Sequence, residues 1–161
     1  MSQLQRSTTE LSAAAHVRRP GFFTRQILNR IVAASTRLGV PVYGSRVLAV
    51  RGRVTGEWRH TPVNPLTLDG ASYLVAPRGH VQWTKNLRAT GEAELKAGRR
   101  TERFTATEVA DADKPAILRA YLARWAFEVG VFFEGVGADS DDAALAAIAP
   151  RHPVFRLTPA E

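Results

Sequence analysis

Residues 51–59 bring together side chains that are suited to bind a phosphate group. Two glycines, Gly56 among them, predict a tight turn between strands, and Arg53, Thr55 and Arg59 would project from it. Backbone N–H groups and guanidinium groups gathered at such a turn can hold one phosphate, as a nucleotide-like cofactor requires. The residues alone leave a second interpretation open, because an arginine-rich turn is often a solvated loop.

Residues 76–88 form a second candidate site. The chain leaves an apolar strand, turns at Pro77 and Gly79, and enters a helical pattern whose first N–H groups are free to face an anion or a carbonyl. Trp83 and Asn86 lie on this helical stretch. By residue type alone, a core position for the tryptophan and a structural role for the asparagine are favoured over contact with a ligand.

The remaining polar residues offer no apparatus for hydrolysis or metal binding. The chain has no cysteine, which excludes disulfides, thiolate metal sites and a cysteine nucleophile. Its four histidines lack the spacing of metal ligands, and its serines lack the context of a nucleophile elbow. We therefore expect no metal site.

Charge is distributed unevenly along the 161 residues, whose formal net charge is +7. Residues 1–103 hold 17 lysines and arginines against 6 acidic residues, whereas residues 104–161 hold 5 against 9. The first two-thirds of the chain should therefore attract anionic ligands. Nucleic acid is not an expected partner, because the arginines are not interleaved with the aromatic side chains that would stack on bases.

The candidate sites need a scaffold, and the pattern of apolar residues predicts a single domain over residues 22–161. Residues 1–21 are expected to form an N-terminal arm. An amphipathic helix is expected over 22–38, which either packs on the core, the favoured interpretation, or lies on an anionic membrane surface. No apolar run is long enough for a membrane helix, so we expect a cytoplasmic protein whose contact with the inner membrane face, if any, is peripheral.

After residue 45 the pattern changes to short strands. Strands are expected over 47–50, 61–68, 73–76, 92–95, 101–109 and 154–157, with tight turns at Asp69-Gly70 and at 98–100. Helices are expected over 81–89, from an N-cap at Asp111 to Trp125, and over 141–148. About six antiparallel strands with flanking helices predict a mainly β fold built as a small barrel.

Four fragments of this pattern carry a resemblance when they are taken in order. They are Gly52-Arg53-x-Thr55-Gly56-x-x-Arg59-x-Thr61-Pro62, Leu68-Asp69-Gly70, Tyr73-Leu74-Val75-Ala76 and Trp83-x-x-Asn86-Leu87-Arg88-Ala89. Over roughly residues 25–110 the chain resembles the deazaflavin (F420)-dependent nitroreductase family of actinobacteria. The resemblance implies a split β-barrel of the FMN-binding type. It also implies an oxidoreductase that transfers hydride from reduced coenzyme F420 to a quinone, an enone or a nitro compound.

The resemblance further implies which residues bind the cofactor. The turn from Arg53 to Arg59 would bind its phosphate, the stretch 61–63 would pass along the deazaflavin ring, and the stretch 76–79 would close the pocket. The implied set is Arg53, Thr55, Gly56, Arg59, Thr61, Pro62, Val63, Ala76, Pro77, Arg78, Gly79, Trp83 and Asn86. No catalytic triad is expected, because the cofactor itself supplies the hydride.

The aromatic residues that follow in the chain are candidates for contact with the hydride acceptor. Tyr121 is the candidate proton donor. An alternative that is at least as well supported is that Tyr121 belongs to the apolar face of its helix and packs in the core. We interpret segment 121–136 as an apolar lid over the ring. The alternative is that its aromatic side chains fill the core, namely Tyr121, Trp125, Phe127, Phe132 and Phe133.

Two other functions remain open from the sequence. A protein of the same fold could bind FMN or another flavin-like ligand in place of F420. A non-enzymatic protein could bind a fatty acid or lipid in an apolar tunnel formed by Phe22, Phe23, Phe127, Phe132 and Phe133. For the enzyme we expect a small-molecule hydride acceptor and either a monomer or a homodimer.

Overall fold

The computed structural model describes residues 45–161, so the arm expected over 1–21 and the helix expected over 22–38 lie outside the described residues. Seven antiparallel strands form one sheet in the order β2-β1-β5-β6-β7-β4-β3. The strands are β1 (Arg46–Arg51), β2 (Trp58–Val63), β3 (Leu66–Leu68), β4 (Ala71–Val75), β5 (Glu92–Ala97), β6 (Arg100–Glu108) and β7 (Val154–Pro159). The helices are α2 (Gln82–Thr90), α3 (Lys114–Val129) and α4 (Asp142–Ile148), with the 3-10 turns η2 (Asp111–Asp113), η3 (Gly130–Phe132) and η4 (Ala149–Arg151).

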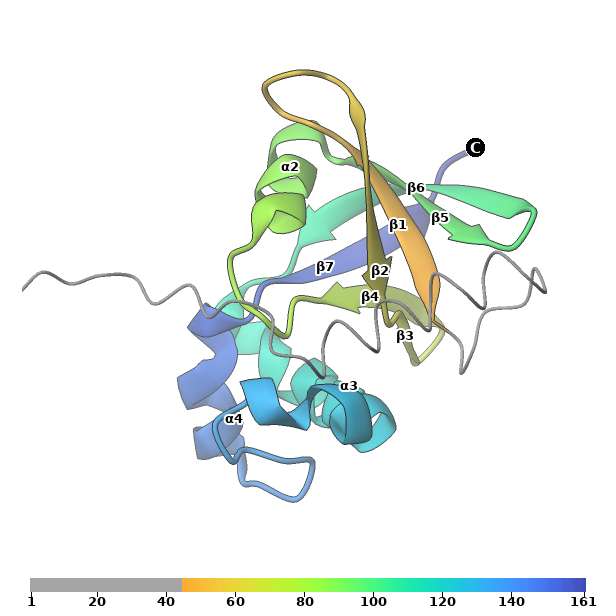
Figure 1. Cartoon of the computed structure of the whole chain (residues 1–161). Coiled ribbons are helices and arrows are strands. Elements are labelled where there is room, and N and C mark those ends of the chain that lie inside the picture. The colour runs from red at the N-terminus through yellow and green to blue at the C-terminus, as the bar shows by residue number, and fades with distance from the viewer. Residues whose placement is uncertain (1–44) are drawn as a thin grey trace, which may run out of the picture.

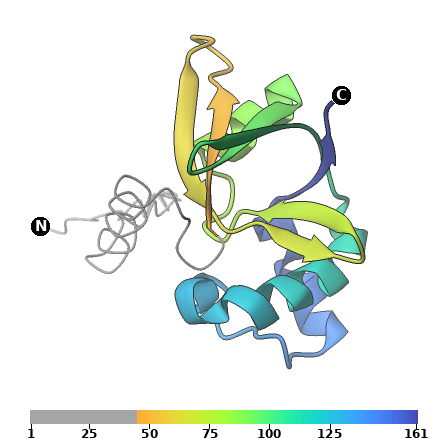
Figure 2. The same cartoon turned by 90° about the vertical axis from the view of Figure 1, so that its right-hand side faces the viewer.

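The sheet curls into a half-barrel because its two edge strands are neighbours in the chain. β2 and β3 stand at opposite ends of the strand order, yet only Asn64 and Pro65 separate them. Two residues cannot span a flat seven-stranded sheet, so the edges must approach each other. The resulting split barrel is visible in Figures 1 and 2 and confirms the predicted fold.

Both predicted hairpin turns are confirmed. Asp69 and Gly70 join β3 to β4 with φ values of 49° and 77°, which are the left-handed conformations that a two-residue hairpin needs. Gly98, with φ of 60°, stands between β5 and β6, whose register pairs Ala97 with Arg100.

Two predicted elements are wrong in detail. The single strand expected over 61–68 is two strands, because Pro65 has no N–H for a ladder and the chain changes from the β1 side of the sheet to the β4 side at that point. The N-cap expected at Asp111 is also wrong. This residue opens the turn η2 and accepts a 2.6 Å bond from Lys114 Nζ, while the N-cap position of α3 is Asp113.

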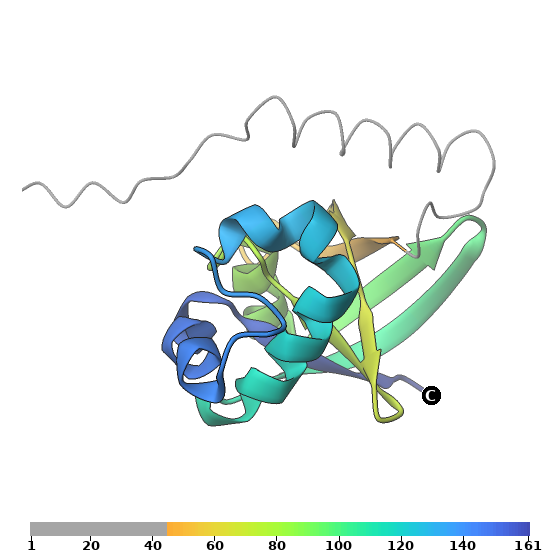
Figure 3. The same cartoon turned by 90° about the horizontal axis from the view of Figure 1, so that it is seen from below.

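The helices cover the two ends of the barrel differently (Figures 1 and 3). α2 lies against β1 and β6, and its buried Trp83 and Leu87 join the barrel core around Leu48, Leu74 and Phe155. α3 and α4 pack on each other at the other end. Their core contains Leu118, Tyr121, Leu122, Trp125, Phe133, Leu145 and Ile148. No helix within residues 45–161 combines the length and apolar character needed to cross a membrane.

Candidate active site

A cavity of about 540 Å³ lies between the barrel and the C-terminal half of α3. This volume falls in the range of about 300–1,000 Å³ that is usual for small-molecule sites. The walls are mainly apolar and come from four parts of the chain: the end of β2, the end of β4 with the loop that follows, the start of α2, and α3 with η3.

Eight of the residues predicted from the sequence line this cavity. They are Thr61, Pro62, Val63, Ala76, Pro77, Arg78 and Trp83 from the predicted cofactor site, and Tyr121, the predicted proton donor. The other six predicted residues lie outside its wall: Arg53, Thr55, Gly56, Arg59, Gly79 and Asn86.

The β1–β2 turn is built as a compact loop beside α2. Gly52 N donates to Glu57 O at 2.8 Å, and Gly56 N donates to Gly52 O at 2.8 Å. A Cβ on Gly52 would lie 3.0 Å from Thr55 Oγ1, so this position favours glycine. Gly56 has φ of 70°, which glycine adopts at little cost. The loop therefore has a fixed shape from which its arginines project.

Asn86 connects this loop to the helix. Its Oδ1 accepts from the backbone N–H of Arg53 at 3.2 Å and from Arg53 Nη1 at 2.8 Å, and Arg53 Nη1 also donates to Gln82 Oε1 at 3.0 Å. Asn86 is 5% exposed, so it acts as the strut that the sequence alone favoured. Because Gln82 lines the cavity, Arg53 is held directly beside a residue of the cavity wall.

Arg59 differs from Arg53 in its surroundings. Its side chain is 59% exposed and lies 3.6 Å from Glu57 Oε2. An exposed pair of this kind fixes a side chain weakly.

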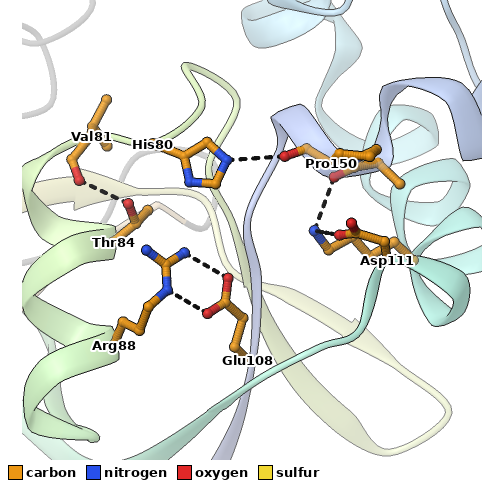
Figure 4. A network of polar contacts seen from close by, with 9 residues as sticks. His80, Val81, Thr84, Arg88, Glu108, Asp111 and Pro150 are labelled. Atoms are coloured by element: carbon orange, nitrogen blue, oxygen red, sulfur yellow. Dashed lines mark hydrogen bonds and ion pairs between the residues drawn. The ribbon is translucent and has the colours of Figure 1, made fainter.

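The loop after β4 is fixed by contacts with both neighbouring elements (Figure 4). His80 Nε2 lies 3.0 Å from Pro150 O, and Thr84 Oγ1 donates to Val81 O at 2.8 Å. Gly79 has φ of 84°, and a Cβ there would lie 3.0 Å from Arg151 O. The route of the chain past the cavity therefore requires glycine at position 79.

A bidentate ion pair anchors α2 to the sheet. Arg88 Nε and Nη2 donate to the two carboxylate oxygens of Glu108 at 2.6 and 2.7 Å (Figure 4). This hydrogen bonding raises the pKa of Arg88 and lowers the pKa of Glu108, so both groups stay charged. The helix that supplies Trp83, Gln82 and Asn86 is thus held in place on β6.

Tyr121 is buried, at 1% exposure, yet it lines the cavity. Burial raises the pKa of its hydroxyl group, and the nearby charge of Glu128 raises this pKa further, while a hydrogen bond with Asn64 lowers it. The net shift is upward, so the hydroxyl group stays protonated well above neutral pH. A neutral phenol at the wall of an apolar cavity can donate a proton or a hydrogen bond.

The aromatic residues of segment 121–136 divide between cavity and core. Phe127 and Phe132 line the cavity, and the Arg78 guanidinium lies 5.1 Å from the centre of the Phe132 ring. Trp125 and Phe133, at 1% and 0% exposure, are buried in the α3–α4 core. The α3 helix continues to Val129, so the lid interpretation can apply only to the residues that face the cavity.

Several cavity residues were not singled out as site residues from the sequence: Asn64, Val75, Val81, Gln82, Glu128, Val129 and Val131. Glu128 lies seven positions after Tyr121, which places both on one face of α3, so that spacing was a usable signal. Nothing local in the sequence indicates that Asn64 would meet them, because it depends on the curl of the sheet.

The residues present fit a cofactor with an apolar ring and an anionic tail. The ring would lie along the apolar wall from Thr61 to Val63 and from Ala76 to Trp83. Two arginines could pair with the anionic group: Arg78 in the cavity wall, and Arg53, which is held by Asn86 and by the wall residue Gln82. A guanidinium group held in this way is prepared for a phosphate.

Comparisons with known proteins agree with this arrangement. A family model described as F420H2-dependent quinone reductase matches residues 24–131. No curated protein matches the chain. Among solved structures, the F420-H2 dependent reductase FDR-A is similar at 16% identity and a TM-score of 0.52, over 71% of this chain and 94% of that one.

Two further structures show the same fold. A chain described as a domain-swapped dimer has 18% identity and a TM-score of 0.53, with 84% of this chain and 97% of that chain covered. The protein Rv2991 from Mycobacterium tuberculosis has 15% identity and a TM-score of 0.51, with 81% and 80% covered. At these identities the likeness concerns the fold.

Proposed function

The chain belongs to the F420H2-dependent quinone reductase family and is an oxidoreductase that uses coenzyme F420, and we propose that its hydride acceptor is a quinone bound in the cavity beneath Phe132. The observation that carries this proposal is the pairing of a mainly apolar cavity with one neutral buried phenol, Tyr121. A planar, electron-poor ring fits such a wall, and its carbonyl oxygen needs a proton once hydride has been accepted. Enones and nitro compounds remain acceptors to be compared with quinones in the test.

We assign the anionic part of the cofactor to Arg53 and Arg78. Asn86 and Gln82 orient the Arg53 guanidinium, so little side-chain freedom is lost when it pairs with a phosphate. Thr55 and Gly56 belong to the same loop as Arg53, Arg59 follows it in β2, and the three would shape the outer edge of the site. Gly79 acts indirectly by letting the chain pass Arg151 closely.

Bound and reduced, F420 supplies a hydride at its ring carbon. A quinone that accepts this hydride and one proton leaves as a hydroquinone. Tyr121 donates the proton from its hydroxyl oxygen, and solvent then replaces that proton. The apolar side chains around the ring keep water away from the hydride.

The test is a titration of the full chain with oxidised F420, with FMN and NADPH titrated beside it. F420 should bind more tightly than the other two. The F420H2-loaded protein should then be oxidised by menadione faster than by an enone or a nitro compound. Tight binding of FMN with no binding of F420 would contradict the cofactor assignment, and turnover with nitro compounds alone would contradict the quinone assignment.

Two finer expectations about partners also stay proposals. The amphipathic pattern of 22–38 is expected to pack on the domain, with contact to an anionic membrane surface as the alternative. The protein is expected to be a monomer or a homodimer. Liposome sedimentation and light scattering test these expectations.

A further inference from the structure

Glu128 is the acidic residue in the cavity wall. The residues of 45–161 that line the cavity include one basic side chain, Arg78, and one acidic side chain, Glu128. They belong to different regions: Arg78 follows β4, whereas Glu128 lies in the last turns of α3. The reaction proposed above does not use Glu128, so its place in a mainly apolar wall needs an explanation.

Asn64 fixes the position of this carboxylate. Asn64 Nδ2 donates to Glu128 Oε2 at 2.9 Å, and Asn64, Tyr121 and Glu128 line the same cavity. Tyr121 and Glu128 are two helical turns apart on one face of α3. The carboxylate is therefore held close to the proposed proton donor and so faces the place where an acceptor would lie.

Glu128 forms no direct ion pair with a basic residue among residues 45–161. Its charge also acts at the Tyr121 hydroxyl, where it disfavours the phenolate. A negative group placed there would meet the same repulsion, strengthened by the apolar surroundings.

Of the two arginines assigned to the anionic part of the cofactor, Arg78 shares the cavity wall with Glu128, whereas Arg53 stands elsewhere. Arg53 is bound to α2 through Asn86 and Gln82. Figure 1 shows α2 and the β1–β2 loop at one end of the molecule and α3 at the other. Arg53 can therefore accept the anionic part of the cofactor at the α2 end, away from the carboxylate of Glu128 on α3.

We propose that Glu128, held by Asn64, selects acceptors by charge: it admits neutral quinones and excludes anionic ones such as an ionised hydroxyquinone. This inference rests on the proposed function, because it concerns the acceptor end of the same cavity. It names Glu128 as a specificity-determining residue. The hydride and proton steps are unchanged by it.

The test compares two quinones of similar size in wild type and Glu128→Gln. The neutral probe is 2-methoxy-1,4-naphthoquinone, and the anionic probe is 2-hydroxy-1,4-naphthoquinone at neutral pH. Glutamine keeps an oxygen that can accept from Asn64 Nδ2 but has no charge. Affinity is measured by calorimetry on protein loaded with oxidised F420, and kcat/KM is measured with F420H2.

We expect Glu128→Gln to raise the affinity and kcat/KM for the anionic quinone by roughly three- to tenfold relative to the neutral one. The value for the anionic quinone is divided by the value for the neutral quinone in each protein. Comparing this anionic-to-neutral ratio between wild type and Glu128→Gln removes the difference in intrinsic reactivity of the two probes. Glu134→Gln is the matched control. It removes the same charge from an exposed side chain that pairs with Arg151 at 2.6 Å outside the cavity wall.

The outcomes separate this inference from the function on which it rests. Charge selection by Glu128 would be overturned if the anionic-to-neutral ratio in Glu128→Gln were unchanged or lower than in wild type. It would also be overturned if Glu134→Gln raised this ratio equally. Wild type that binds F420 but reduces neither quinone would instead overturn the proposed acceptor class. The calorimetric ratio would then still report whether Glu128 repels an anion in the cavity, because that measurement needs no turnover.

Discussion

Arg53 lies in the β1–β2 turn and Arg59 in β2 just after it, and the two differ in what holds their guanidinium groups. Arg53 Nη1 is bound by Asn86 and Gln82, whereas Arg59 has one exposed contact with Glu57. We expect Arg53→Ala to weaken F420 binding by about 1.5–3 kcal/mol, the range of a charged hydrogen bond, and Arg59→Ala to weaken it less. Fluorescence titration with F420 measures both values. Equal affinities in wild type and Arg53→Ala would remove Arg53 from the cofactor site.

The hydroxyl group of Tyr121 is the proposed proton donor. Removing its hydroxyl group in Tyr121→Phe should lower kcat with menadione by about 10- to 100-fold, because the proton donor is lost. The affinity for F420 should stay near that of wild type. Since burial raises the pKa of the tyrosine, its ionisation should not limit the rate between about pH 7 and 9. A variant with the kcat of wild type would show that the proton comes from elsewhere.

The sequence predicted the residues of the cavity wall better than it predicted the polar contacts between side chains. The place of Thr61 to Val63 in the site was implied by the family resemblance, whereas the stretch from Ala76 to Arg78 was also indicated by its turn between a strand and a helix. The contacts of Asn86 with Arg53 and of Asn64 with Glu128 join residues 33 and 64 positions apart. Such contacts follow from the closure of the barrel, which a local pattern does not reveal.

Phe132 and Phe133, which follow the end of α3, are neighbours in the chain but lie in different surroundings. Phe133 is fully buried, stacks on His152 with ring centres 4.3 Å apart, and contacts Tyr121. Phe132 is half-buried and lies in the cavity wall under Arg78. The turn η3 and the left-handed Glu134, with φ of 53°, orient the two rings differently.

Mutating these two residues should therefore give different results. Phe133→Ala should lower the free energy of unfolding by about 3–5 kcal/mol and reduce turnover of every acceptor together. Phe132→Ala should change the relative kcat/KM for quinones and enones while its melting temperature stays close to that of wild type. Thermal unfolding and a panel of acceptors measure both effects. If Phe132→Ala unfolds as early as Phe133→Ala, this ring belongs to the core.

The strands show which parts of the fold a sequence determines locally. The β3–β4 and β5–β6 hairpins were predictable because their turn residues adopt positive φ where the pattern required it. The break between β2 and β3 was missed because the apolar and β-branched residues between Thr61 and Leu68 match the pattern of one strand, although Asn64-Pro65 is a turn signal within them. That break is a property of the curled sheet, since it moves the chain from one edge strand to the other.

His152 connects the α3–α4 core with the barrel core. It is buried, stacks on Phe133 of the α3–α4 core, and its Nδ1 lies 3.3 Å from the carbonyl oxygen of Ala76 in the barrel core. Burial lowers the pKa of His152, so the folded protein holds it neutral at neutral pH, and the charge of Arg151 adds to this shift. The bond to Ala76 opposes the shift without reversing it.

The lowered pKa gives a prediction with a definite sign. The unfolded chain binds a proton at His152 more readily than the folded protein does, so stability is present above the ordinary histidine pKa and falls as the pH falls through the lower folded value. The stability advantage of wild type over His152→Asn should therefore shrink between about pH 8 and pH 5. Urea unfolding at several pH values measures it. A difference that stays constant over this range would mean that His152 does not titrate differently in the two states.

The last prediction concerns the uneven charge of the chain. Residues 1–103 carry a surplus of arginine and lysine, residues 104–161 carry a surplus of acid, and the cavity lies where the two parts meet. Binding of the anionic cofactor should weaken about three- to tenfold when NaCl rises from about 50 to 500 mM, because salt screens exposed charges. The KM for neutral menadione should change less than about twofold, since no charge is paired when it binds. Arg53→Ala provides the control: its cofactor affinity should depend less on salt than that of wild type. If the cofactor affinity of wild type does not depend on salt, apolar contacts with the ring and not the arginines determine binding.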